Sequence, residues 1–183
     1  MDQVVTQGPA KVVGPDDGKL GFLGTIGVRF MIDGSETNGG FSLVEHPMSP
    51  RALAAPLHRH TNEDEYSFVL EGRMGALLGD EVLEAGPGDL VFKPRGQWHT
   101  FWNASDQPSR ILEIIAPAGF EQFFERLSDM GGVTAVPPET LGALCAGINE
   151  MIASLGDEQE RGEKYRKELE EKLTGQEGAL PFI

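Results

Sequence analysis

The chain is short of cysteine, of long hydrophobic runs and of positive charge, and each shortage excludes a class of protein. Its single cysteine, Cys145, leaves no internal disulfide, which excludes a disulfide-stapled scaffold. No apolar run approaches the roughly 18 residues of a membrane-spanning helix, and residues 1–7 lack the basic and apolar regions of a secretion signal. A formal net charge of −14 repels nucleic acid phosphates and anionic lipids. We expect a cytoplasmic protein with neither nucleic acid nor membrane as a partner.

The chain is rich, by contrast, in residues that make turns. Its 24 Gly and 12 Pro favour a turn-rich β protein over a helical bundle, and 39% of the residues are hydrophobic, which is enough for a core. The predicted strands are 28–32, 41–45, 53–60, 65–70, 75–78, 81–84, 89–93, 99–103 and 111–115. Glycines at the ends of these strands are expected to adopt positive φ angles: Gly72, Gly86, Gly88 and Gly96. Many short strands at even spacing indicate an antiparallel sandwich or barrel.

The hydrophobic period changes from strand-like to helical after residue 117. An apolar stripe at helical spacing follows, made of Phe120, Phe123, Phe124 and Leu127. A second stripe over 141–155, which includes Cys145 as a buried thiol, and a charged segment over 157–172 predict further helices. The expected organisation is an N-terminal arm (1–18), a β-barrel (19–117) and a C-terminal helical extension (118–183).

Three of the four histidines fall in two spaced motifs. The motifs read His58-x-His60-x4-Glu65-x6-Gly72 and Gly88-x5-Pro94-x-Gly96-x2-His99-x3-Asn103. Residues two apart on a strand point to the same face, so His58 and His60 are expected to project inward together. Glu65 follows a turn, and His99 comes from a separate strand. Three neutral imidazoles and one carboxylate suit a divalent transition metal, with positions left for substrate or dioxygen.

Both motifs resemble those of the cupin family, G-x5-H-x-H-x3,4-E-x6-G and G-x5-P-x-G-x2-H-x3-N. The second matches at every defined position, and the first departs only at its leading glycine, where Ala52 stands. The resemblance implies a mainly β fold, the double-stranded β-helix or jelly-roll barrel, with the helical extension packed outside it. It also implies one divalent metal ion held by a set of four ligands: His58, His60, Glu65 and His99. Fe, Mn, Ni, Co, Cu and Zn all suit these ligands.

A single cupin barrel followed by residues 119–127 looks like the quercetin 2,3-dioxygenase-like bacterial cupins. That resemblance implies a metal site that binds an enol or flavonol oxygen and admits dioxygen, with Glu65 as the base that deprotonates the hydroxyl. We therefore expect a metal-dependent oxidoreductase acting on a small organic molecule. A metal-dependent isomerase or lyase and a non-catalytic small-molecule-binding cupin are the alternatives. A homodimer is also expected, which light scattering at micromolar concentration would test.

Four further residues are assigned roles by their type and position. Phe101 shares the inward face of His99 and is expected to wall an apolar pocket. Trp102 points the other way and is expected to pack under the helices or at a dimer contact. Arg95 is either a partner for an anionic substrate or a solvated turn residue. His46 belongs to neither motif, so a surface or packing role is the expectation.

Overall fold

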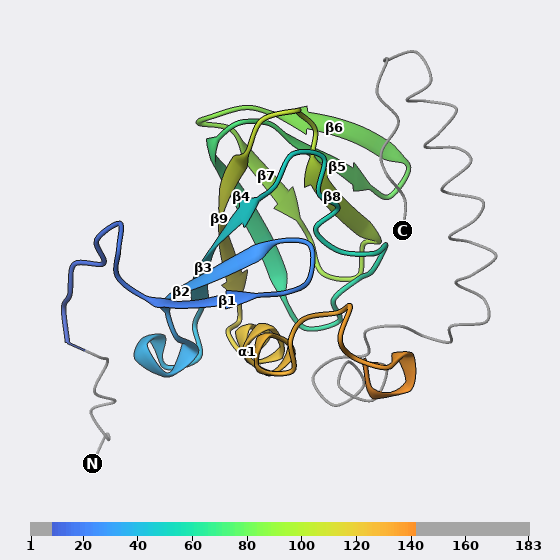
Figure 1. Ribbon diagram of the computed structural model, residues 1–183. Coiled ribbons are helices and arrows are strands. Elements are labelled where there is room, and N and C mark those ends of the chain that lie inside the picture. Colours follow the sequence, from blue (N-terminus) through green and yellow to red (C-terminus); the bar gives the residue numbers. More distant parts are fainter. Residues whose placement is uncertain (1–8, 142–183) are drawn as a thin grey trace.

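The computed structural model describes residues 9–141, which fold into two antiparallel sheets that face each other across a common core (Figure 1). The larger sheet has the strand order β1 (Lys19–Phe22), β2 (Gly27–Ile32), β3 (Ser42–Met48), β9 (Ser109–Ala116), β4 (Asp64–Glu71) and β7 (Leu90–Lys93). The smaller sheet has the order β6 (Glu81–Ala85), β5 (Met74–Leu78) and β8 (His99–Asn103). A 3-10 turn, η1 (Gly34–Thr37), follows β2. The predicted mainly β jelly roll is confirmed, as two separate sheets rather than one continuous closed sheet.

Eight of the nine predicted strands overlap observed strands, and the ninth, 53–60, is wrong. This segment touches β8 only at the isolated bridges Leu53↔Trp102 and His58↔His99. Pro56 lies between the bridges, and a proline has no N–H to donate to a ladder. The structure also contains a strand that was not predicted, β1, whose four residues are mostly exposed and show no clear apolar alternation.

The core follows the two-residue period of the strands. Along β9 the burial alternates, so that Ser109, Ile111, Glu113 and Ile115 face inward. On the neighbouring strand β3, Val44, His46 and Met48 face the same interior. Most inward side chains are aliphatic, which supplies the burial that stabilises the fold. The exceptions include Glu113 on β9 and His46 on β3, which place ionisable groups inside the barrel.

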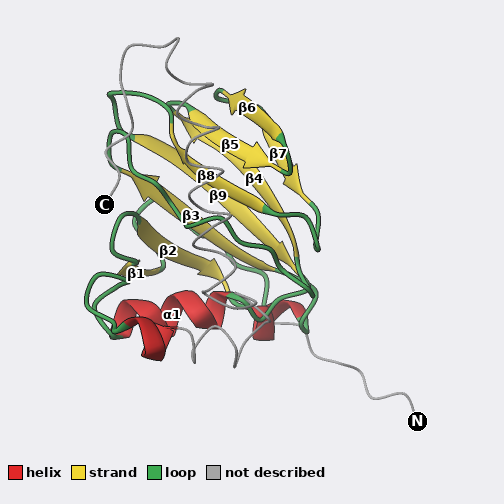
Figure 2. Ribbon diagram, turned by 90° about the vertical axis from the view of Figure 1, so that its right-hand side faces the viewer, coloured by secondary structure: helices red, strands yellow, loops and turns green. Residues whose placement is uncertain are grey.

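Helix α1 (Glu121–Asp129) lies across one end of the two sheets (Figures 1 and 2). Its predicted apolar stripe is confirmed, because Phe120, Phe123 and Leu127 are all buried and Phe124 packs on the same core. Glu121 anchors the start of the helix by accepting hydrogen bonds from the backbone N–H groups of Gly34 and Gly119. A further helix begins at Pro138. The remaining predicted helices and Cys145 lie outside the described residues.

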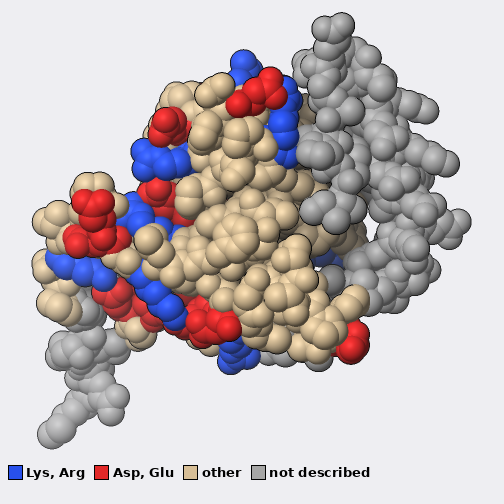
Figure 3. Space-filling view, viewed as in Figure 1, with Lys and Arg blue, Asp and Glu red and all other residues tan. Residues whose placement is uncertain are grey.

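Many of the charged side chains among the described residues form ion pairs. In Figure 3, acidic and basic side chains lie next to one another at the margins of the face shown, while its centre carries few of either sign. Lys19 contacts Glu125 at 2.6 Å, which ties β1 to α1. Glu45 pairs with both Arg29 and Arg110, on the two strands that flank β3. Among residues 9–141, no helix is long and apolar enough to cross a membrane.

The glycine predictions are mostly confirmed, and the exception has a simple geometric cause. Gly72, Gly88 and Gly96 have φ angles of 77°, 92° and 77°, but Gly86 does not adopt a positive φ. The N–H of Asp89 donates to the carbonyl of Gly86, which makes residues 86–89 a β-turn. Gly88 occupies its third position, where a positive φ is required after the proline. Gly86 is the first residue of that turn and needs no special conformation.

We predict that Gly75→Ala destabilises the fold. A Cβ added at Gly75 would lie 2.3 Å from the ring of Trp102, its buried cross-strand partner on β8. Overpacking of this kind costs about 1–3 kcal/mol, measurable by urea unfolding. Gly86→Ala is the matched control, since its Cβ would meet nothing closer than 3.9 Å, and it should change stability by less than about 0.5 kcal/mol. Equal stability of both variants would show that Trp102 moves freely.

Candidate functional site

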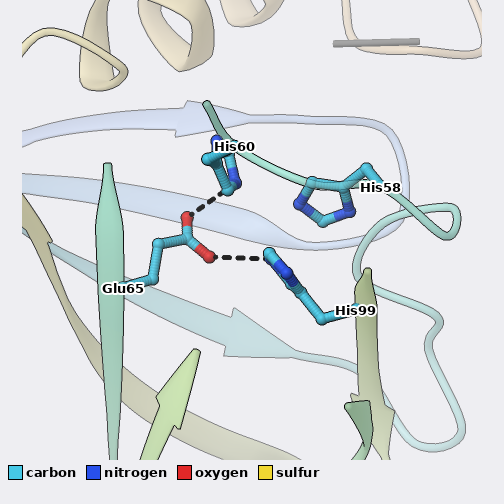
Figure 4. Close-up of side chains that lie close together, drawn as sticks. All are labelled: His58, His60, Glu65 and His99. Atoms are coloured by element: carbon cyan, nitrogen blue, oxygen red, sulfur yellow. Dashed lines mark ion pairs between the residues drawn. The ribbon is translucent and has the colours of Figure 1, made fainter. Parts of the chain in front are cut away.

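Three histidines and one glutamate converge inside the barrel (Figure 4). His58 and His60 come from the segment before β4, Glu65 is the second residue of β4, and His99 is the first residue of β8. One ligand atom from each residue lies within 4.8 Å of the others, and none of the four is more than 4% exposed. The structure therefore brings together the four residues that the sequence motifs single out.

Backbone hydrogen bonds hold His58 and His60 in place although no regular strand contains them. The N–H of His58 donates to the carbonyl of His99 at 2.9 Å, and the N–H of His99 donates back at 2.7 Å. The N–H of Gly96 donates to the carbonyl of His60 at 2.7 Å. The segment is thus extended locally, so the expected two-residue alternation still directs both imidazoles inward.

Two of the imidazoles are fixed with one nitrogen free for a ligand bond. The Nδ1 atoms of His58 and His99 lie 2.8 Å and 3.0 Å from the carbonyl oxygens of Pro56 and Gln97. A carbonyl only accepts, so each Nδ1 carries the proton and each Nε2 keeps its lone pair. Among the described residues, the buried Nε2 atoms of His60 and His99 have no hydrogen-bond partner. Lone pairs left unsatisfied inside a barrel fit a bound cation.

The environment keeps these ligands in the protonation states that metals require. Burial, reinforced by the neighbouring His99 and His60, holds the pKa of His58 well below its usual range, and burial lowers the pKa of His60 to about 4. For Glu65, burial raises the pKa, but the charges of Lys93 and His60 act in the opposite direction and hold it well below its usual range. At neutral pH His58 and His60 are therefore neutral, and Glu65 is an ionised carboxylate.

A buried lysine, which the sequence analysis missed, completes the site. Lys93 is 1% exposed, and its Nζ lies 2.8 Å from an oxygen of Glu65 and 2.8 Å from an oxygen of Glu113. The other oxygen of Glu113 accepts a hydrogen bond from Ser67 at 2.8 Å. Burial lowers the pKa of Lys93, but the two carboxylates raise it by more, so the ammonium persists. Strand alternation would have placed both Lys93 and Glu113 on inner faces, beside Val91 and Ile115.

An apolar cavity opens beside the cluster. Its walls are mainly aliphatic and aromatic, with contributions from Leu23, Phe101, Phe120, Phe123, Phe124 and Leu127. The polar side chains among its lining residues are His46, His58, Glu65 and Glu113. The predicted position of Phe101 is confirmed. Arg95 lies outside the cavity, exposed and paired with Asp64 at 2.7 Å, which leaves it the solvated turn role.

Asn103, the last defined residue of the second motif, has a structural role. Its side-chain amide donates to the carbonyls of Ser49 and Gln107 at 3.0 Å and 2.7 Å, and its side-chain oxygen accepts from the backbone N–H of Ser105. Asn103 is completely buried. It therefore fastens the loop after β8 to the end of β3, and it supplies no group to the cavity.

We predict that Lys93→Met destabilises the protein by about 3–5 kcal/mol, because it leaves two buried carboxylates without their cation. Adding Glu113→Gln to this variant removes one of the two charges and should restore part of the loss. Urea unfolding of the wild type and both variants at pH 7.5 provides the measurement. A single variant as stable as the wild type, or a double variant less stable than the single, would contradict the assignment of Lys93 as the counter-ion.

Comparison with known sequences identifies the β domain. Residues 45–115 match the family described as Cupin domain. Quercetin 2,3-dioxygenase of Bacillus subtilis (strain 168) is 26% identical over 103 residues, which make up 55% of this chain and 29% of that protein. The chain thus matches less than a third of the length of this curated relative, so the likeness concerns only a part of that protein.

Solved structures extend the likeness. The polyketide cyclase RemF from Streptomyces resistomycificus is 31% identical, with a TM-score of 0.53 over 59% of this chain and 80% of that one. KdgF from Halomonas sp. is 16% identical, with a TM-score of 0.54 over 62% of this chain and 99% of that one, and shows the fold alone. These proteins share a similar fold but have different names, so the fold alone does not identify the reaction of this chain.

Proposed function

Because this chain belongs to the cupin superfamily, we propose that it is a metal-dependent oxidoreductase of the dioxygenase-like kind, acting on an apolar, ring-bearing molecule with an enolic or phenolic hydroxyl. One observation carries the proposal: the buried cluster of three histidines and a glutamate adjoins a cavity whose walls are aromatic and aliphatic. The donor set suits the metal, and the walls suit the substrate.

The residues of the cluster fit a divalent metal by their chemistry. His58, His60, His99 and Glu65 would hold it, since their ligand atoms are buried and close together. At neutral pH the imidazoles of His58 and His60 are neutral and Glu65 is ionised. When bound, the metal supplies a Lewis acid that acidifies a hydroxyl and a centre able to activate dioxygen. Fe, Mn, Ni, Co, Cu and Zn remain candidates, because ligand type alone does not separate them.

Glu65 is the proposed base. One of its carboxylate oxygens lies 2.8 Å from Lys93, and the other faces His60 at 3.4 Å. The ion pair with Lys93 holds the carboxylate ionised and fixes its orientation, so the second oxygen can accept the proton of a substrate hydroxyl. Lys93 is a positioning residue in this scheme, because it acts through Glu65.

The charges around the cavity favour an uncharged substrate over an anion. Lys93 is already paired with Glu65 and Glu113, and Arg95 lies outside. No lysine or arginine is among the described residues that line the cavity. A sugar phosphate or a small dicarboxylate would therefore enter without a counter-ion, next to two carboxylates. Flat, ring-bearing molecules match the aromatic walls, and the names of two relatives, for quercetin and for a polyketide, support this class.

A second candidate is metal-assisted ring closure without oxidation. The identity of 31% to a polyketide cyclase favours it, and the same carboxylate would then remove a proton next to a carbonyl. Other isomerase or lyase reactions use the same groups, and a cupin that only binds its ligand is the non-enzymatic alternative. Consumption of dioxygen separates the first proposal from all of these.

We predict that the metal-loaded protein consumes dioxygen in the presence of a flavonol, measured with an oxygen electrode and by loss of flavonol absorbance. Glu65→Gln should lower the rate by roughly 10²–10⁴-fold through loss of the base. Glu71→Gln is the matched control, since Glu71 lies on the same strand with an exposed side chain paired to Arg110. Its rate should equal that of the wild type.

Metal content is determined for each protein, so that loss of the base is not confused with loss of the metal. Anaerobic conversion of a ring-bearing probe would replace the oxidative proposal by the cyclase or isomerase alternative. Tight binding of flavonols with no turnover under any condition would leave the binding-protein alternative.

A further inference from the structure

One buried histidine of the cavity takes no part in the cluster. His46 lies on the inner face of β3 between Val44 and Met48, and it is 1% exposed. It lines the same apolar cavity as Glu65. A surface or packing role was the expectation for this residue, yet it is buried and the interior around it is aliphatic and aromatic. A polar ring in such a place is costly unless its nitrogens find partners.

The two nitrogens of His46 differ in their partners. Nδ1 lies 2.9 Å from the carbonyl oxygen of Gly27, which only accepts, so Nδ1 carries the proton. Burial lowers the pKa of His46 to about 4, and the ring is neutral at physiological pH. Nε2 therefore keeps a lone pair, and His46 lines the cavity, so this lone pair can serve a ligand there. It is an acceptor in a cavity that otherwise offers few polar groups away from the cluster.

The position of His46 places this acceptor away from the proposed base. On β9, His46 pairs with Ile111 and Glu65 pairs with Ile115, so four residues of register separate the two levels. Helix α1 shows the same separation from the other side. Phe120 contacts His60 with ring centroids 4.4 Å apart, and Phe124, four residues later, contacts His46 at 5.2 Å. The wall between the two polar ends is therefore aromatic.

We infer that His46 is a specificity-determining residue, whose Nε2 accepts a hydrogen bond from a second hydroxyl on the substrate, remote from the hydroxyl that Glu65 deprotonates. The inference rests on the proposed function and narrows its substrate class. The preferred molecule has an enolic hydroxyl at one end, a flat ring system along Phe120 and Phe124, and a hydroxyl on the far ring. A substrate with an apolar far end would leave the nitrogen of His46 buried without a partner.

Binding of a matched set of probes tests this inference without turnover. The probes are 3-hydroxyflavone and its 2′-, 3′- and 4′-hydroxy derivatives, titrated into the full-length, metal-loaded protein under anaerobic conditions by isothermal titration calorimetry. One neutral hydrogen bond corresponds to a preference of about fivefold to tenfold. The wild type should bind at least one far-ring hydroxy derivative more tightly than 3-hydroxyflavone by about this factor.

Two variants distinguish a hydrogen-bonding role of His46 from a packing role. His46→Phe keeps a ring against Phe124 but lacks both nitrogens, while His46→Asn keeps a donor for the carbonyl of Gly27 and lacks Nε2. Both should lose the preference while still binding 3-hydroxyflavone. Phe124→Leu is the control, since it trims the same wall and should change the affinity of all probes without altering the preference.

The outcomes separate this inference from the proposed function. Probes that bind the wild type without preference, or a preference that survives in either His46 variant, overturn the role of His46 and leave the proposed function standing. If none of the probes binds the wild type, the proposed substrate class fails, and the inference fails with it.

Discussion

The ion pairs of Lys93 are the interaction on which the interior of this protein depends. Two carboxylates, Glu65 and Glu113, face inward from neighbouring strands of one sheet, and neither would be tolerated there alone. Lys93 reaches both at 2.8 Å from the edge strand β7. The three residues lie on β7, β4 and β9, so the ion pairs also tie three adjacent strands in one register. Removal of the lysine charge leaves both carboxylates buried without a cation.

This arrangement divides the interior into a polar end and an apolar remainder. At the polar end, Lys93 keeps Glu65 ionised, and backbone carbonyls orient His58 and His99. Beyond it, aromatic rings from β8 and α1 form the cavity walls. Charged groups that are desolvated but paired interact more strongly than they would in water, which is the condition for polarising a bound hydroxyl. We expect the same apolar walls to disfavour substrates that carry a charge.

The sequence predicts the local features of the site better than its surroundings. The spacing of His58 and His60 predicts their common direction, which holds even though 53–60 is not a strand, because alternation needs only an extended backbone. The four cluster residues come together as their motifs suggest. The helical stripe from Phe120 to Leu127 predicts a buried face, but its role as a cavity wall depends on α1 crossing the end of the sheets. No periodicity encodes that crossing.

The residues that sequence reasoning missed share one property, which is that their partners are distant in the chain. Lys93 sits at an undefined position of its motif, and Glu113 stands in an apolar strand, so each looks exceptional until the two are seen in contact. His46 belongs to no motif, and only the tertiary structure shows that it lines the same cavity as Glu65. Ionisable residues at inward strand positions therefore indicate buried ion pairs, even when the partners lie far apart in the chain.

The central claim is that three imidazoles and Glu65 form a divalent metal site. The most direct measurement is the metal content, by plasma mass spectrometry, of the purified and reconstituted wild type, His99→Ala and His46→Phe. The account predicts about one ion per chain in the wild type and in His46→Phe, which removes a buried histidine outside the cluster, and loss of most of the metal from a folded His99→Ala. A wild type that stays metal-free after reconstitution, or a His99→Ala variant that retains the full amount, would contradict it.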